Sequence, residues 1–151
     1  QFNPIYPLDD DSKYYNMNPT VNDRAHCLVY VVPADQQSIM NEHVLKLMKE
    51  IRKKVSDSDI PQVVLLTKVD EACLLVRNDL QKVYRSTYIK AQIESASKTL
   101  GIPVNCIFPV KNYSGEISLN DEIDVLSLTA LLQILRFANG YLLNLDQKQH
   151  N

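Results

Sequence analysis

Glycine is scarce in this sequence, and its positions exclude the loop that cradles phosphate groups in many nucleotide-binding proteins. Only Gly101, Gly115 and Gly140 occur among the 151 residues. None of them lies in the pattern G-x-x-x-x-G-K-[ST], whose backbone N–H groups surround a β-phosphate. The switch pattern Asp-x-x-Gly is missing as well. We therefore expect this chain to hold no Mg²⁺ and to contain no catalytic residues for phosphoryl transfer.

Paired cysteines and an excess of basic charge are also missing. The three cysteines, Cys27, Cys73 and Cys106, are odd in number, and none has the spacing of a metal ligand. Cys27 and Cys106 lie in apolar runs, so we expect small buried side chains in a reducing compartment and no metal site. The net charge of −2 argues against nucleic acid as a partner.

The sequence shows no pattern of a secretory leader or of a membrane span. It begins at Gln1 without a basic segment followed by an apolar one, so we expect no signal peptide. The longest apolar region, residues 125–145, is interrupted by polar side chains, which favours an amphipathic helix and no membrane contact. The interrupting residues are Ser127, Thr129, Gln133, Arg136, Asn139 and Asn144.

Short apolar runs alternate with segments of helical periodicity over most of the chain. The runs are rich in β-branched residues, as in strands that are covered on both faces. This alternation predicts an α/β fold with three layers, in which a parallel sheet of about three strands is flanked by three main helices. The expected strands are 25–32, 62–66 and 102–110, and the expected helices are 41–55, 85–100 and 121–143.

The two ends of the chain are predicted to lie outside this unit. Residues 1–24 have neither period and are rich in Asn, Asp, Pro and Tyr, which favours an extended arm or loop. Residues 144–151 are predicted to form a polar tail. The strand at 25–32 would leave a hydrophobic edge open, so we expect the arm or another chain to cover it, with self-association as one outcome. The last helix is expected to bury Leu128, Leu131, Leu132, Leu135, Ala138 and Leu142.

The second apolar run stops abruptly at a Thr-Lys-Val-Asp tetrad, residues 67–70. In an open parallel sheet, ligands bind beyond the carboxyl ends of the strands. Guanine presents two adjacent donors, N1–H and the N2 amino group, which one carboxylate can accept together and which adenine lacks. Asp70 fits that role, while the stem of Lys68 can lie along the base and Thr67 can hydrogen-bond to adjoining turns.

The end of the third strand is predicted to complete this guanine site. A backbone N–H of Asn112 or Tyr113 would donate to guanine O6. The alternative interpretation of the tetrad is a solvated turn that caps a helix at Asp70.

Four segments, QFNP, DRAHCLVYVV, LLTKVD and PVKNYS, resemble in order and spacing the GTPase-like domain of the interferon-induced protein 44 family. The resemblance covers nearly the whole chain. It implies that residues 25–143 are the C-terminal half of such a domain, a partial P-loop GTPase-like fold whose phosphate-binding half precedes Gln1. Lys111, Asn112 and Tyr113 stand where GTPases often carry Ser-Ala-Lys. The resemblance further implies a cytoplasmic, interferon-induced protein of antiviral defence and innate immunity, with GTP or GDP as the ligand of the intact protein.

The predicted function is therefore half of a guanine-nucleotide-binding domain, the half that recognises the base. Because the phosphate cradle is missing, the isolated chain should bind nucleotide weakly or not at all, whereas the intact protein could be a slow GTPase. The alternative is a protein-interaction or scaffold module on the same fold, without nucleotide turnover. A flavodoxin-like or response-regulator fold fits the alternation of elements but leaves residues 67–70 unexplained.

Overall fold

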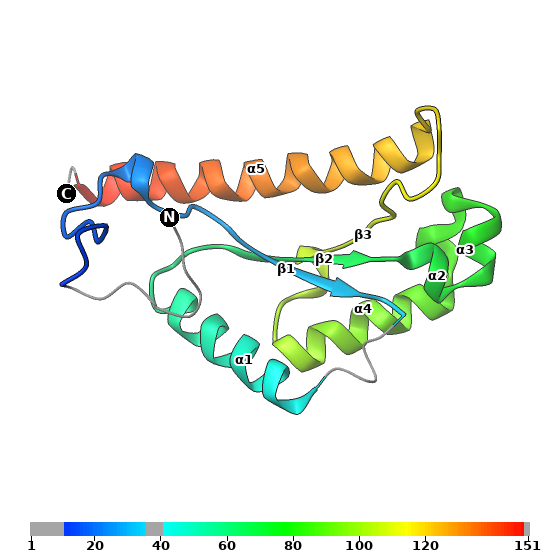
Figure 1. Ribbon diagram of the computed structural model, residues 1–151, viewed down its shortest axis with the longest axis horizontal. Coiled ribbons are helices and arrows are strands. Elements are labelled where there is room, and N and C mark those ends of the chain that lie inside the picture. Colours follow the sequence, from blue (N-terminus) through cyan, green and yellow to red (C-terminus); the bar gives the residue numbers. More distant parts are fainter. Residues whose placement is uncertain (1–10, 36–40, 150–151) are drawn as a thin grey trace.

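Three parallel strands form the sheet at the centre of the protein (Figure 1). The computed structural model describes residues 11–35 and 41–149. The strands are β1 (Leu28–Pro33), β2 (Gln62–Thr67) and β3 (Ile107–Pro109), hydrogen-bonded in the order β1-β2-β3. This sheet and its flanking helices confirm the predicted α/β fold, and the layout is consistent with a partial P-loop-like fold.

Helices cover the two faces of the sheet unequally. In Figure 1, α1 (Glu42–Ser56) and α4 (Thr87–Leu100) lie on one side of the strands, and α5 (Asp121–Gln149) runs along the other side. Between β2 and α4 the chain forms three short turns of helix, in a segment whose periodicity is unclear from the sequence. They are α2 (Val69–Ala72), α3 (Leu74–Asn78) and the 3₁₀ segment η3 (Leu80–Arg85).

Local capping explains where the helices begin and end. The side chain of Asn41 accepts a hydrogen bond from the backbone N–H of His43 at 2.8 Å, so Asn41 caps α1. Ser86 caps α4 in the same way, through the N–H of Ile89. Gly101 ends α4 at φ 69°, in the left-handed conformation that glycine adopts without a steric penalty.

The core lies between the sheet and the helices α1 and α4. Tyr30, Val32, Val64 and Leu66 point to this side and are at most 6% exposed. They pack with apolar residues of α4 and of the turns that precede it. The principal members of that second group are Val69, Val76, Val83, Ile89, Ala96 and Leu100.

The first and third strands begin later than predicted, whereas β2 begins at Gln62 as expected. β1 begins at Leu28, whose N–H donates to the carbonyl oxygen of Pro61, and not at residue 25. β3 spans only three residues, because Val104–Cys106 form a 3₁₀ turn, η4, after Pro103. Proline has no N–H to donate to a neighbouring strand, so it does not extend the ladder.

The prediction for the exposed face of α5 is wrong. Leu128, Leu131, Leu132 and Leu135 were expected to be buried, yet they are 47–61% exposed. The helix instead buries Ile123, Leu126 and Ala130. A sheet of three strands is too narrow to cover more than one stripe of a 29-residue helix. α5 continues into the predicted polar tail as far as Gln149.

Length and composition alone would allow α5 to cross a membrane. The segment 121–148 is the one helix in the described residues that passes this test, and 6% of its most apolar window is buried. A single helix of this kind is weak evidence for a membrane span. The absence of membrane contact therefore stays a prediction.

β1 is an edge strand, paired within the described residues only with β2. Val31, on the side of the sheet that faces α5, is 59% exposed. Figure 1 places the described part of the predicted arm, residues 11–24, near the C-terminal end of α5. The start of the arm, residues 1–10, lies outside the described residues.

Candidate functional site

The end of β2 holds three of the residues that were predicted to bind guanine. Thr67 Oγ1 donates to the carbonyl oxygen of Val32 at 3.5 Å and so links the ends of β1 and β2. Val69 is completely buried and anchors α2, whose first turn contains Asp70. The side chain of Asp70 is 15% exposed. Asp70 is therefore a partly buried acceptor that is held by a rigid neighbour.

Lys68 has an unusual backbone conformation between Thr67 and the buried Val69. Its φ of 58° and ψ of 37° lie in the left-handed region. Among the described residues other than glycine, only Asp59 shares a positive φ. Asp tolerates this conformation better than lysine, for which it costs about 1–2 kcal/mol. Backbone outliers of this kind cluster at ligand-binding and catalytic sites.

The end of β3 brings Lys111 to Asp70. The N–H of Val110 donates to the carbonyl oxygen of Leu66 at 2.9 Å and extends the ladder by one residue. Lys111 follows directly, and its Nζ lies 4.0 Å from Asp70 Oδ2. The same Nζ lies 2.5 Å from Glu116 Oε1. The three charged side chains are 15–23% exposed, which makes them a compact and partly desolvated cluster.

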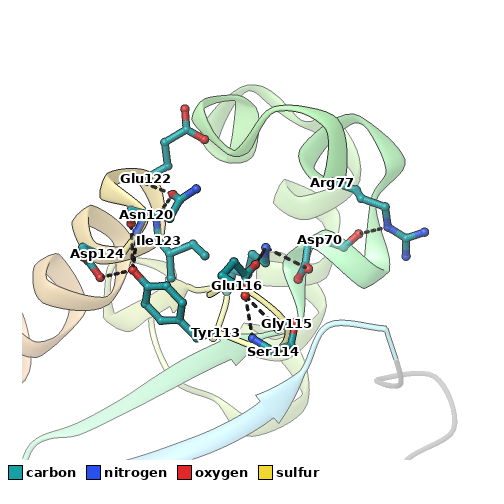
Figure 2. A network of polar contacts seen from close by, with 11 residues as sticks. Asp70, Arg77, Tyr113, Ser114, Gly115, Glu116, Asn120, Glu122, Ile123 and Asp124 are labelled. Carbon is teal, nitrogen blue, oxygen red and sulfur yellow. Dashed lines mark hydrogen bonds and ion pairs between the residues drawn. The ribbon is translucent and has the colours of Figure 1, made fainter. Parts of the chain in front are cut away.

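Glu116 closes the turn that follows Lys111. Its Oε2 accepts hydrogen bonds from the backbone N–H groups of Ser114 at 2.8 Å and Gly115 at 3.1 Å, as Figure 2 shows. The hydrogen bond from Lys111, together with these backbone donors, lowers the pKa of Glu116 to about 2. The hydrogen bond with Glu116 raises the pKa of Lys111. Both groups are therefore charged at neutral pH.

The side chain of Tyr113 fastens the same loop to α5 (Figure 2). Its hydroxyl lies 2.8 Å from Asp124 Oδ1, to which it can donate, and accepts from the N–H of Asn120 at 2.7 Å. Asn112, before it, is exposed. The predicted donation to guanine O6 involves the backbone of Asn112 or Tyr113, so it stays a prediction.

Lys111 and Glu116 were not among the residues predicted to bind guanine. Lys111 carried a usable signal, because it follows the third apolar run directly and so lies at the same sheet edge as Asp70. No sequence signal pointed to Glu116, since its contact with Lys111 depends on the conformation of the turn between them. Across residues 11–35 and 41–149, no three His, Cys, Asp or Glu side chains are grouped as metal ligands.

The fold and the site together define an α/β unit with a parallel sheet, whose carboxyl edge presents an acidic and a basic side chain side by side. Three curated relatives are similar to this chain in sequence. The chain is 32% identical to human interferon-induced protein 44-like and 31% identical to human interferon-induced protein 44, each over 99% of its length. It is 30% identical to mouse interferon-induced protein 44 over 94% of its length.

These homologues are members of the interferon-induced protein 44 family, and the chain matches a fragment of that family. It spans about a third of the length of these relatives, 33–34%. No family model and no solved structure matches the chain.

Proposed function

We propose that the chain is the base-recognition half of a guanine-nucleotide-binding domain. The observation that carries this proposal is the carboxylate of Asp70, which is partly buried at the carboxyl end of β2, two residues after the strained Lys68. Its two oxygens can accept N1–H and the N2 amino group of guanine together. The exposed stem of Lys68 can cover a face of the base.

The homologues carry the words "interferon-induced" in their names. We extend this to the present chain and propose that the intact protein is a cytoplasmic component of an interferon-induced antiviral response. GTP or GDP would be its ligand, and its phosphates would be held by sequence outside this chain. We further propose that the intact protein hydrolyses GTP slowly.

The proposal is tested by titrating the 151-residue chain with GMP and AMP while recording amide chemical shifts, which detect millimolar affinities. GMP should shift resonances at the ends of β2 and β3, and AMP should not. Asp70→Ala should weaken GMP binding by at least about tenfold, because hydrogen bonds to a charged group are lost. Glu71→Ala is the matched control, since Glu71 is exposed and pairs with Arg77 at 2.9 Å.

Two results would contradict the proposal in different ways. If the shifts caused by GMP persist in Asp70→Ala, Asp70 does not bind the base. If calorimetry gives micromolar or tighter binding of GTP to this chain, the expectation of weak binding without a phosphate cradle is wrong.

An interaction module is the second candidate function, and the exposed stripe of α5 favours it. Val125, Leu128, Leu132 and Leu135 are 47–62% exposed and recur every three or four residues. Val31 on the edge strand is exposed on the same side of the sheet. A continuous apolar surface of this kind marks a binding site or a tendency to associate.

Light scattering over a range of concentrations tests this second function. The wild-type chain should show a mass that rises with concentration, and a Leu128→Lys, Leu132→Lys double variant should remain a monomer. Leu119→Lys is the control, because Leu119 is 83% exposed but lies outside α5. A sharp monomer for the wild-type chain at high concentration would exclude self-association through this surface.

A further inference from the structure

The ammonium of Lys111 is the nearest cation to the carboxylate that is proposed to bind guanine, at 4.0 Å. We propose that Lys111 contacts the base, its ammonium donating to O6 and N7 of guanine while Asp70 accepts from N1–H and the N2 amino group. This inference rests on the proposed function and assigns the contact that determines the preference at position 6 of the base.

The backbone holds the two charged groups at a fixed separation. Asp70 and Lys111 each follow a buried valine, Val69 at 0% and Val110 at 4% exposure. The N–H of Val110 is tied to Leu66 on β2. Because both residues emerge from neighbouring and well-packed strand ends, an acceptor and a donor lie side by side before any ligand arrives. Such preorganisation lowers the cost of binding.

The chemistry of this pair matches guanine and opposes adenine. Guanine places its acceptor O6 next to its donor N1–H, so a neighbouring donor and acceptor on the protein are both satisfied. Lysine donors to O6 and N7 are an established way of recognising guanine in DNA. Adenine carries an amino group at position 6 and an acceptor at N1, so it would place a donor against Lys111 and an acceptor against Asp70.

Glu116 holds Lys111 more closely than Asp70 does in the unliganded protein. Lys111 Nζ is 2.5 Å from Glu116 Oε1, much closer than its 4.0 Å to Asp70 Oδ2. An ammonium has three donor hydrogens, and Glu116 needs one of them. The remaining donors can serve O6 and N7 while Asp70 keeps its acceptors for the base. Glu116 therefore acts as a positioning residue.

The test compares four nucleotides on one set of variants by the same amide-shift titration. The ligands are GMP, 6-thio-GMP, IMP and AMP. Wild-type protein should prefer GMP to 6-thio-GMP, because sulfur accepts hydrogen bonds weakly. Lys111→Met should weaken GMP binding by about 5- to 150-fold and bring GMP and 6-thio-GMP to similar affinity. IMP, which lacks the N2 amino group, should remain sensitive to Lys111→Met because it retains O6.

Two further variants distinguish loss of the contact between Lys111 and the base from a general disturbance of the folded protein. Glu116→Gln keeps an acceptor oxygen for Lys111 and removes the charge that holds it, so it should reduce the preference for GMP over 6-thio-GMP less than Lys111→Met does. Lys111→Arg keeps charge and donors and should retain part of that preference. The wild-type comparison of GMP with 6-thio-GMP needs no variant, so equal binding of the two would overturn the inference even if Lys111→Met does not fold.

The outcomes distinguish this inference from the function on which it rests. If GMP binding depends on Asp70 but is unchanged in Lys111→Met, or if wild type binds 6-thio-GMP as tightly as GMP, Lys111 does not contact the base and guanine binding stands. If the wild-type chain shows no guanine-selective shift at all, the proposed function and this inference are both overturned.

Discussion

The middle of β2 and its carboxyl end differ in almost every physical property, although they are adjacent in the chain. Val63, Val64 and Leu66 are completely buried and pack without polar partners. Two residues past Leu66 the backbone enters the left-handed region at Lys68, and Asp70 then lies 4.0 Å from Lys111. The middle of β2 is stabilised by burial of apolar side chains. Its carboxyl end contains a strained backbone and charged side chains that are partly removed from water.

This difference indicates which part of the strand supports the fold and which part supports a function. Conflicts between local preference and the adopted structure are expected mainly at functional sites, because selection for stability alone would remove them. A lysine in a conformation that favours glycine is such a conflict. This conflict supports the proposal of a ligand at the strand end.

The largest effect expected from this comparison is at Leu66. Leu66→Ala should lower the free energy of unfolding by about 2–5 kcal/mol, because it leaves a cavity in a completely buried position. Leu132→Ala on the exposed stripe of α5 removes the same atoms and should cost no more than about 0.5 kcal/mol. Urea denaturation at low protein concentration measures both.

An equal loss for the two leucines would show that the stripe of α5 is covered in solution. In that case the loss at Leu132 should grow with protein concentration, since association stabilises the folded chain. The exposed stripe of α5 would then be a buried surface of an associated form, and not an open face of the protein.

The order of strands and helices was predictable because short apolar runs and helical periods are strong signals. The caps at Asn41 and Gly101 were predictable from residue type. The buried stripe of α5 was not, because Val125 and Leu128 are as apolar as Leu126 and Ala130. Periodicity cannot select between two apolar stripes when the sheet beneath covers only one of them.

The site was predictable only where it depends on strand ends. Asp70 stands at the edge of the sheet because the buried run before it ends there, and Lys111 stands there for the same reason. The left-handed backbone at Lys68 could not be predicted from the sequence, because this conformation is usually recognised by a glycine at the position. The contact of Glu116 with Ser114 and Gly115 depends on the closure of a turn and was equally hidden.

The next largest effect contrasts two positions with positive φ. Lys68→Gly should raise the free energy of unfolding by about 0.5–1 kcal/mol, since relief of backbone strain exceeds the entropy cost of glycine. Gly101→Ala should lower it by about 1–2 kcal/mol, because φ is 69° and the new Cβ would lie 3.2 Å from the guanidinium of Arg52. Thermal denaturation checks both signs.

If Lys68→Gly lowers the free energy of unfolding, the middle of β2 and its carboxyl end do not differ in the way described above. Such a result would mean that the side chain of Lys68 supports the fold, which would remove the strain argument for a ligand at this strand end. Asp59→Gly provides a reference, because Asp59 also has a positive φ but makes an ion pair with Lys148 at 2.9 Å. Its gain should be smaller than that of Lys68→Gly.

The smallest expected effect is the pH dependence of the Glu116 turn. The pKa of Glu116 is lowered from 4.5 to about 2 in the folded protein, so its contacts with Lys111, Ser114 and Gly115 are fully present above pH 4.5 and are lost as the pH falls toward 2. Carbon-detected NMR of the Glu116 carboxyl group measures this titration. In Lys111→Met the pKa should rise toward 4.5 but remain below it, because the two backbone donors persist. A wild-type pKa near 4.5 would show that Lys111 is not held by Glu116, and the ammonium would then be available to neutralise Asp70.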